Sequence, residues 1–228
     1  MALTNTRSKS ALIAGATGLV GVQCLARLLE HPAYDRVTVL SRRPIARSHA
    51  KLHVELVDFD GLRSLGEHCD DLFCCLGTTI RKAGSQDAFR RVDHDYPLAL
   101  ARLGKAAGAQ QFLMVSALGA DARSPVFYSR VKGEAEHDIA AIGLQKAIFM
   151  RPSILLGERH APRPGERAGI FVGQLIAPLL VGPLRKYRPI HADDVAAAML
   201  YAANNEVREG PIDSDEIVRL AQQENAAT

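Results

Sequence analysis

Short apolar runs alternate with stretches of helical spacing over most of this chain, and that alternation constrains its fold more than any other feature. The apolar runs, each typical of a strand, span residues 10–16, 36–43, 51–59, 71–79, 111–119 and 146–157. Helical patterns span 18–31, 86–108 and 126–142, and Pro97 is expected to kink or divide the second of these. The alternation predicts an α/β fold in which a doubly wound parallel sheet of Rossmann type carries helices on both faces. Ligands bind such sheets at the carboxyl ends of the strands, so we expect functional residues just after each apolar run.

The pattern changes after residue 157. A polar loop rich in proline and glycine leads to an apolar stretch at 170–184, and a helix is expected within 188–205. This tail is too short for a large second domain. We therefore predict a single domain over residues 1–228, in which residues 158–228 form a small cap on the substrate side.

Charge and hydropathy argue against several classes of protein. The formal net charge is +3, from 28 basic and 25 acidic residues, and so small an excess does not favour nucleic acid or an anionic membrane. The stretch at 170–184 is shorter than the roughly 20 residues that span a bilayer, and it contains two prolines. The first apolar run ends in glycines rather than at a cleavage site, so no signal peptide is expected.

Cysteine and histidine spacing indicates neither a metal site nor a disulfide. The four cysteines, at positions 24, 69, 74 and 75, match no zinc pattern, and adjacent cysteines rarely form an unstrained disulfide. His160 and His191 have no second ligand at a suitable spacing. We expect buried thiols in a reducing compartment and predict a cytoplasmic location.

A glycine turn follows the first apolar run. The segment Gly15-Ala16-Thr17-Gly18-Leu19-Val20-Gly21 has the pattern G-x-x-G-x-x-G, and the next helix begins inside it. Glycines allow a tight turn and a close approach of a pyrophosphate to backbone amides, and the helix N-terminus adds unpaired N–H groups. The strand–turn–helix context predicts a dinucleotide site rather than a plain turn.

The ends of the next strands indicate which dinucleotide would bind. Many dinucleotide folds carry an acidic residue after the second strand for the ribose 2′-hydroxyl, but this chain has Arg42 and Arg43. Arginine can bind a 2′-phosphate with two hydrogen bonds, which favours NADP(H) over NAD(H). Asp58 follows the third strand and either accepts from the adenine amino group or caps a turn. Gly77 follows the fourth strand and would allow close approach of a ribose.

A serine, a tyrosine and a lysine form the candidate catalytic set. Ser116 ends a strand, Tyr128 lies near the start of the next helix, and Lys132 is one turn further on the same face. A free tyrosine has a pKa near about 10, and a neighbouring ammonium lowers it by favouring the phenolate. Such a phenol can protonate a substrate oxygen, while the serine hydroxyl holds that oxygen. The lysine can also reach the nicotinamide ribose. The alternative is that these residues are ordinary helix surface.

Taken together, these segments resemble the short-chain dehydrogenase/reductase superfamily in its atypical branch, and most closely the HTATIP2-like family of oxidoreductases. The matching segments are "AGATGLVG", "SRRP", "VDFDGL", "CCLGTT", "RVDHDYPLALA", "VSALGAD", "YSRVKGEAE", "RPSILLGER", "RPGE" and "PIHADDVAAAM". They follow the family's order and extend to about residue 200. The resemblance implies a Rossmann fold, NADP(H) binding and the catalytic set of Ser116, Tyr128 and Lys132.

The resemblance also implies which residues contact the cofactor. The implied residues are Gly15, Thr17, Gly18, Leu19, Val20, Gly21, Arg42, Arg43, Asp58, Phe59, Leu76, Gly77, Thr78, Lys132, Arg151, Pro152, Ser153 and Ile154. Two departures stand out. The superfamily's catalytic asparagine, on the helix after the fourth strand, has no evident counterpart here. The substrate region is also much shorter than in nucleotide-sugar epimerases, which argues against a large sugar nucleotide.

Two functions remain open from the sequence. The first is an NADP(H)-dependent oxidoreductase that transfers hydride to or from a small carbonyl or alcohol, with Tyr128 as acid and base. The second is a non-catalytic NADP(H)-binding regulator that controls a protein partner. The helices at 86–108 and 126–142 are those that the superfamily often pairs in dimers, so a homodimer is an expectation as well.

Overall fold

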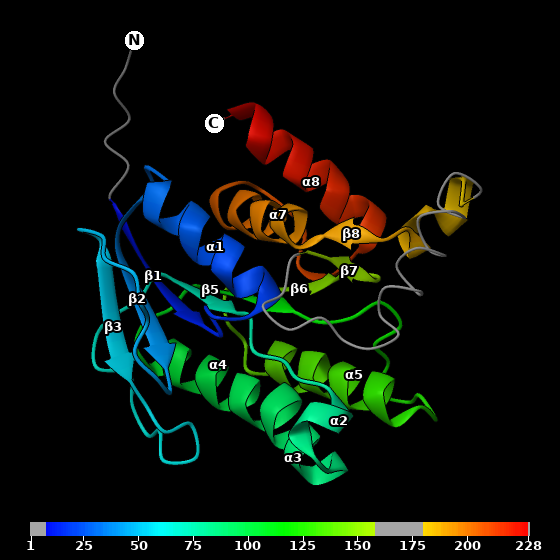
Figure 1. Ribbon diagram of the computed structural model, residues 1–228, viewed down its shortest axis with the longest axis horizontal. Helices are drawn as coiled ribbons and strands as arrows, with labels where there is room; N and C mark the ends of the chain where they lie inside the picture. Colours follow the sequence, from blue (N-terminus) through cyan, green and yellow to red (C-terminus); the bar gives the residue numbers. More distant parts are fainter. Residues whose placement is uncertain (1–7, 158–179, 228) are drawn as a thin grey trace.

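The computed structural model describes residues 8–157 and 180–227. Within them, seven parallel strands form one sheet in the order β3-β2-β1-β4-β5-β6-β9 (Figure 1). The strands are β1 (Lys9–Ala14), β2 (Tyr34–Ser41), β3 (Leu52–Leu56), β4 (Asp71–Cys74), β5 (Gln111–Val115), β6 (Lys146–Arg151) and β9 (Gly210–Asp213). The strand order reverses direction between β1 and β4, so a doubly wound Rossmann-type sheet is confirmed.

Helices cover both faces of the sheet (Figure 1). One face carries α1 (Leu19–Glu30), α7 (Ala192–Asn204) and α8 (Ser214–Ala227). The opposite face carries α4 (Tyr96–Ala106) and α5 (Phe127–Ala140), with the short α2 (Ile80–Ala83) and α3 (Gln86–Arg90) beside them. Side chains alternate between the faces along each strand: Ile13 and Phe73 join the first core, whereas Leu12 and Leu72 join the second.

The helix expected at 86–108 is divided in the way that its proline predicts. Between α3 and α4 lies one π-helical segment, η1 (Arg91–Asp95). Pro97 occupies the first turn of α4 and has no N–H for the carbonyl of Asp93. The backbone N–H of Tyr96 instead bonds the carbonyl of Arg91, which is the wider spacing of a π-turn.

The C-terminal segment differs from the expected cap. β9 pairs with β6 and extends the main sheet, and α7 packs between α1 and α8 with all of its alanines buried. The small residues of α7 permit this close packing. Residues 192–227 therefore belong to the main layers rather than to a cap. Residues 158–179 lie outside the described residues, and a cap on the substrate side stays a prediction for them.

Two short elements sit beside the sheet on its carboxyl side. β7 (Leu155–Leu156) pairs with β8 (Ile190–His191), and the 3-10 helix η3 (Gly182–Tyr187) precedes β8. This pairing brings the segment that follows β6 next to the start of α7.

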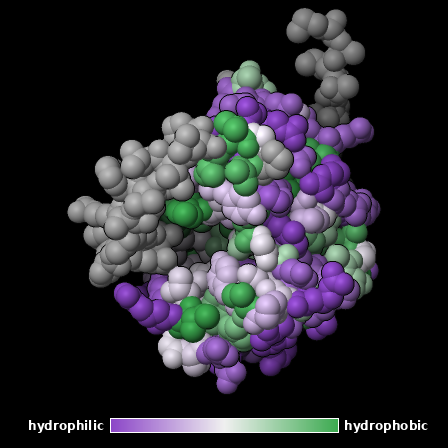
Figure 2. Space-filling view, turned by 90° about the vertical axis from the view of Figure 1, so that its right-hand side faces the viewer, coloured by the Kyte–Doolittle hydropathy of each residue, from purple (hydrophilic) through white to green (hydrophobic). Residues whose placement is uncertain are grey.

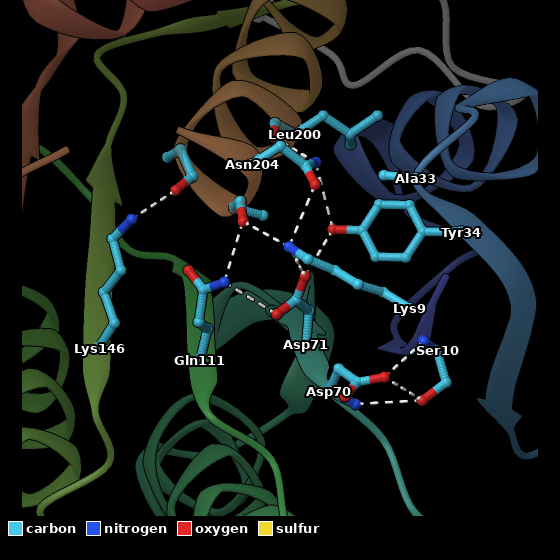
Figure 3. Close-up of polar contacts among 12 residues, drawn as sticks. Lys9, Ser10, Ala33, Tyr34, Asp70, Asp71, Gln111, Lys146, Leu200 and Asn204 are labelled. Carbon is cyan, nitrogen blue, oxygen red and sulfur yellow. Dashed lines mark hydrogen bonds and ion pairs between the residues drawn. The ribbon is translucent and has the colours of Figure 1, made fainter. Parts of the chain in front are cut away.

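Polar side chains gather at the amino ends of the strands, opposite the expected site (Figure 3). The buried carboxylate of Asp71 accepts from Tyr34 Oη at 2.7 Å and from Gln111 Nε2 at 2.9 Å, and it pairs with Lys9 Nζ at 3.0 Å. Lys9 and Gln111 also donate to the carbonyl of Ala203, near the end of α7. The network thus supplies hydrogen bonds to the carbonyl groups at the C-terminus of α7, which have no partners within the helix.

Candidate functional site

The glycine turn lies tightly between β1, α1 and the loop after β4. Gly15 has a φ of 85°, a conformation that glycine adopts readily and other residues avoid. A Cβ atom on Gly15 would lie 2.5 Å from the carbonyl carbon of Cys75, and one on Gly21 would lie 2.0 Å from the oxygen of Gly15. The spacing of these glycines is therefore required by backbone packing, before any ligand is considered.

The N-terminus of α1 opens toward this turn. Its N-cap is Gly18, and no side chain among the described residues caps it. The first turn also contains no acidic residue. The first amide groups of α1 therefore keep their donors available, and the helix dipole favours an anion at this point.

Arg42 and Arg43 follow β2 and are exposed. Neither guanidinium pairs with a carboxylate of residues 8–157 or 180–227, and the backbone of Arg43 is held by the hydroxyl of Ser41. Asp58 is also exposed, and its carboxylate accepts from the backbone N–H of Asp60 at 3.2 Å, which is a turn-capping contact. Phe59 is buried and stacks on Tyr96 with the ring centres 5.4 Å apart. No contact in the described chain joins these residues to the catalytic set.

The loop after β4 brings the glycine turn close to the candidate lysine. A Cβ atom on Gly15 would lie 2.7 Å from the backbone nitrogen of Leu76. A Cβ atom on Gly77 would lie 3.9 Å from Lys132 Nζ. The backbone N–H of Thr78 donates to Asp93 Oδ2 at 2.9 Å. Leu76, Gly77 and Thr78 therefore lie between two of the expected functional groups.

Asp93 is a candidate site residue that the sequence analysis did not single out. It lies in η1, it is 1% exposed, and its Oδ1 is 2.8 Å from Lys132 Nζ. The helical region after the fourth strand therefore carries an aspartate, not an asparagine, beside the lysine. The available signal was an aspartate four residues before Pro97, where the helix cannot keep its regular hydrogen bonds.

Lys132 and Tyr128 lie on one face of α5 but differ in burial. Lys132 is 4% exposed, whereas Tyr128 is 36% exposed and packs on Phe89 with ring centres 5.5 Å apart. Burial lowers the pKa of Lys132, but the Asp93 carboxylate and then the Tyr128 phenol outweigh burial and hold that pKa above its usual value. Lys132 is consequently a cation beside a tyrosine that solvent can reach.

Ser116 has a partner other than the tyrosine. Its hydroxyl donates to Oε1 of Glu136, which lies one turn beyond Lys132 on α5, and both residues are buried. Arg151 Nε donates to Glu136 Oε1 at 3.0 Å, and the pKa of Arg151 is raised by this hydrogen bond. The Ser116 proton is thus donated to the buried Glu136, which also pairs with the half-buried Arg151. The sequence analysis did not anticipate this group.

The segment after β6 packs over the glycine turn. Pro152 is buried, Ser153 donates to the carbonyl of Arg188, and Ile154 is half-exposed. A Cβ on Gly157 would lie 2.7 Å from Leu19 Cδ1 at the start of α1. These contacts bring the segment beside the turn. The Ser153 hydroxyl and the Arg151 guanidinium, however, already donate hydrogen bonds to Arg188 and Glu136.

Figure 2 views the carboxyl side of the sheet, where the surface is hollowed and apolar side chains stand among polar ones. Several apolar side chains of the elements around this edge are exposed. They are Ile80, Val126, Ile154, Val181, Leu184 and Tyr187.

The residues present fit a dinucleotide. Gly15 and Gly21 leave no room for side chains, the N-terminus of α1 offers free amides, and Gly77 lets a ligand approach Lys132. A pyrophosphate can accept hydrogen bonds from the amides of α1, and the hydroxyl groups of a ribose can bond the Lys132 ammonium. His191 precedes α7 and His160 lies outside the described residues. Within residues 8–157 and 180–227, no three His, Cys, Asp or Glu side chains are grouped as a metal site would require.

Solved structures share this fold at low sequence identity. The structure of MoeE5 in complex with UDP-glucose and NAD matches with a TM-score of 0.65 at 17% identity, over 94% of this chain and 81% of that one. The structure of human epimerase family protein SDR39U1 with NADPH matches with a TM-score of 0.55 at 18% identity, over 89% of this chain and 72% of that one. Identities in this range establish the architecture and nothing finer.

Curated relatives are closer in sequence. Protein HTATIP2 of Rattus norvegicus is 39% identical over 176 residues, which is 74% of this chain and 72% of that protein. The mitochondrial protein FMP52 of Eremothecium gossypii is 32% identical over 222 residues, which is 95% of this chain and 99% of that protein. Because FMP52 relatives are named as mitochondrial, the cytoplasmic location finds no support in them and stays a prediction. Among the described residues, no helix has the length and apolar character needed to cross a membrane.

The family model of the NAD dependent epimerase/dehydratase family matches residues 11–213. That range includes the glycine turn, Asp93, Ser116, Tyr128 and Lys132. The resemblance to atypical short-chain dehydrogenases is confirmed by the HTATIP2 and FMP52 relatives. The chain belongs to the NAD dependent epimerase/dehydratase family, as an NAD(P)-binding protein of the atypical short-chain dehydrogenase/reductase type.

Proposed function

We propose that the protein is an NADP(H)-dependent oxidoreductase that acts on a small carbonyl or alcohol. The observation that carries this proposal is the pairing of a buried ammonium, Lys132, with a solvent-accessible phenol, Tyr128, one helical turn away at the edge where the glycine turn lies. Family membership supports an NAD(P) cofactor. The finer assignments rest on the residues themselves.

The cofactor would lie along residues of six segments. The pyrophosphate would be held through backbone amides of Gly15, Thr17, Gly18, Leu19, Val20 and Gly21. A 2′-phosphate would be bound by Arg42 and Arg43, and the adenine would lie against Asp58 and Phe59. The nicotinamide half would contact Leu76, Gly77, Thr78, Lys132, Arg151, Pro152, Ser153 and Ile154. When bound, the cofactor supplies or accepts hydride. The two exposed arginines, with no acidic residue at the end of β2, support NADP(H) over NAD(H).

In the chain's own chemistry, Tyr128 Oη gives a proton to the substrate oxygen in reduction and takes it back in oxidation. The Lys132 ammonium favours the phenolate that remains after the proton leaves. Ser116 is not free to donate a hydrogen bond to the substrate, since its hydroxyl donates to Glu136. It would hold a substrate oxygen only after that hydrogen bond is exchanged.

The test is turnover in the presence of NADPH with a panel of aldehydes, ketones and quinones. Tyr128→Phe is expected to lower kcat/KM at least about 100-fold, which is the usual contribution of a positioned acid, while NADPH affinity changes little. Tyr201→Phe, on the half-buried face of α7, is the matched control and should keep full activity. Equal rates in wild type and Tyr128→Phe would contradict the proposal.

The use of the Ser116 proton by Glu136 favours one second candidate, an NADP(H)-binding regulator without turnover. Such a regulator would bind NADPH in the same site, and its affinity for a protein partner would depend on the cofactor, because NADPH must stabilise one conformation over another. NADPH binding with no turnover on the whole panel would favour it. Partner affinity that is identical with and without NADPH would contradict it.

A further inference from the structure

Asp93 is held at the junction of the cofactor loop and the candidate catalytic helix. Its Oδ2 accepts from the backbone N–H of Thr78 at 2.9 Å, and its Oδ1 lies 2.8 Å from Lys132 Nζ. The side chains of Asp93 and Lys132 are 1% and 5% exposed. A pair buried this completely is not an ordinary surface salt bridge, whose contribution is small and screened by solvent.

The π-turn sets the position of Asp93 against α5. Three polar pairs join residues 90–94 to α5: Arg90 pairs with Glu134, Asp93 with Lys132, and His94 Nε2 with Asp138 at 3.0 Å. A π-turn adds one residue to a helical turn, and such turns often occur at functional sites. It lets two successive residues, Asp93 and His94, both reach partners on the same neighbouring helix.

Burial creates the need for a carboxylate here. An isolated buried lysine loses its proton at a pH several units below the usual value of about 10.4, because desolvation disfavours the charged form. Three titratable groups face the Lys132 ammonium: Asp93 from η1, Tyr128 from α5 and Cys74 from β4. Burial raises the pKa of Cys74 to about 12, so its thiol is neutral at working pH. Asp93 is the one carboxyl group among the three.

We propose that Asp93 is a positioning residue that keeps Lys132 protonated beside Tyr128 and ties it to the cofactor loop at Thr78. The inference rests on the proposed function, since it gives Lys132 the role of the cation that tunes Tyr128. An amide at this position would keep the hydrogen bond to Thr78 but would provide no negative charge. The carboxylate is therefore the feature that matters for the protonation of Lys132.

The direct test follows the protonation of Lys132 by NMR in protein with 13C-labelled lysine, with Lys132→Met used to assign the signal. In wild type, we expect no titration of Lys132 below about pH 10. In Asp93→Asn, we expect Lys132 to titrate below about pH 9, since desolvation shifts of several units are then unopposed. Titration of Lys132 below pH 9 in wild type, or above pH 10 in the variant, would overturn the proposal. Titration below pH 9 in wild type would overturn the proposal even if the variant does not fold.

Asp138→Asn is the matched control. It removes the His94–Asp138 pair between the same two segments, one and a half turns of α5 beyond Lys132, and should leave the titration of Lys132 unchanged. A shift as large as that of Asp93→Asn would mean that general loosening of the helix contact, and not the carboxylate, controls Lys132.

The functional readout is the pH dependence of NADPH affinity and of turnover. For Asp93→Asn, both should fall about tenfold or more relative to wild type between pH 7 and pH 9, and both should return when the pH is lowered. Recovery at lower pH separates loss of a proton from misfolding, which lower pH would not repair. If no substrate of the panel is turned over by wild type, the proposed function fails, but the NMR titration and the NADPH affinity still decide the role of Asp93.

Discussion

At the scale of single residues, the candidate acid and its cation meet very different surroundings. Tyr128 is reached by solvent, whereas Lys132 is almost fully buried. A charge in a low-dielectric interior acts more strongly on its neighbours than a surface charge does, since water and salt screen it less. The exposure of Tyr128 suits a group that must exchange protons, and the burial of Lys132 suits a group that must keep its proton.

The two arginines after β2 carry the prediction about cofactor choice. Replacing both in the variant Arg42→Ala/Arg43→Ala should weaken NADPH binding by about 10- to 100-fold, because each hydrogen bond to a charged phosphate contributes about 1.5–3 kcal/mol and exposure reduces that value. NADH, which has no 2′-phosphate, should bind with nearly unchanged affinity. The measurement is the Kd of each cofactor by fluorescence titration.

Arg47→Ala serves as a control on the same loop. It removes one positive charge a few residues further along the chain, and should change both affinities little. An equal loss for NADPH and NADH in the double variant would contradict the assignment of these arginines to the 2′-phosphate.

Residues such as Gly15 and Tyr128 could be found in the sequence because their roles depend on local spacing. Gly15 needs only the turn between a strand and a helix, and Tyr128 needs Lys132 four residues later on one helix. Asp93 and Glu136 could not be assigned, because their partners, Lys132 and Ser116, lie 39 and 20 positions away. Such contacts depend on how helices pack, and for Asp93 also on a π-turn that shifts the helical spacing.

At the scale of elements, the central strands are fastened at the end opposite the site (Figure 3). Asp70 precedes β4, and its Oδ2 accepts from the backbone N–H of Ser10 at 2.7 Å and from the Ser10 hydroxyl at 2.9 Å. Ser10 lies in β1, so these hydrogen bonds fix the start of the β1–β4 pair. The pair flanks the point where the strand order reverses, and its alignment therefore determines how the glycine turn meets the loop after β4.

Asp70 should give the fold a dependence on acid. Burial raises the pKa of Asp70, but the hydrogen bonds from Ser10 and His68 outweigh burial and lower it below the usual value. A carboxylate with a lowered folded-state pKa stabilises the fold above its unfolded pKa of about 3.9 and loses that contribution as pH falls through the folded value. Asp70→Asn should therefore lower the free energy of unfolding at pH 7 by about 1–2 kcal/mol. Urea unfolding at several pH values measures the difference.

The difference between wild type and Asp70→Asn should shrink below about pH 4 and vanish as Asp70 becomes protonated in wild type. Asp35→Asn, which alters an exposed carboxylate in β2, is the control and should show little change at any pH. A difference that stays constant down to pH 2 would show that hydrogen bonding without charge explains the effect.

The expected strands and helices were found nearly in place because their patterns are local. The expected helix at 18–31 is observed as α1, Leu19–Glu30, and the expected strand at 71–79 ends at Cys74 because the glycine loop takes over. β9 was missed because Gly210 and Pro211 give it no apolar run, and only Ile212 is buried. Its place in the sheet comes from pairing with β6 and packing beneath α8, neither of which a four-residue pattern reveals.

At the scale of the whole molecule, the last 18 described residues complete the sheet and one face of the core. Ile212, Ile217, Leu220 and Ala221 are all buried in the same cluster as α1 and α7. A chain that ends after Arg208 should therefore lose cooperative folding. Burial of three large apolar side chains contributes about 1.5–3 kcal/mol each, which is comparable with the whole stability of about 5–15 kcal/mol.

Thermal unfolding followed by circular dichroism measures this, with a broad or absent transition expected for the shortened chain. Removal of residues 226–228 alone is the control and should leave the transition intact, since Ala226 and Ala227 are exposed. A cooperative transition within a few degrees of wild type in the chain that ends after Arg208 would contradict the prediction.

The reversal of strand order between β1 and β4 also separates the two groups of proposed site residues along the chain. Residues 8–57 build β1, β2 and β3 on one side of the reversal, and residues 71–213 build the strands on the other. Arg42 and Arg43 belong to the first part, whereas Asp93, Tyr128 and Lys132 belong to the second. Under the proposed assignments, a lineage could exchange one cofactor for another through substitutions after β2 and inherit its proton chemistry unaltered.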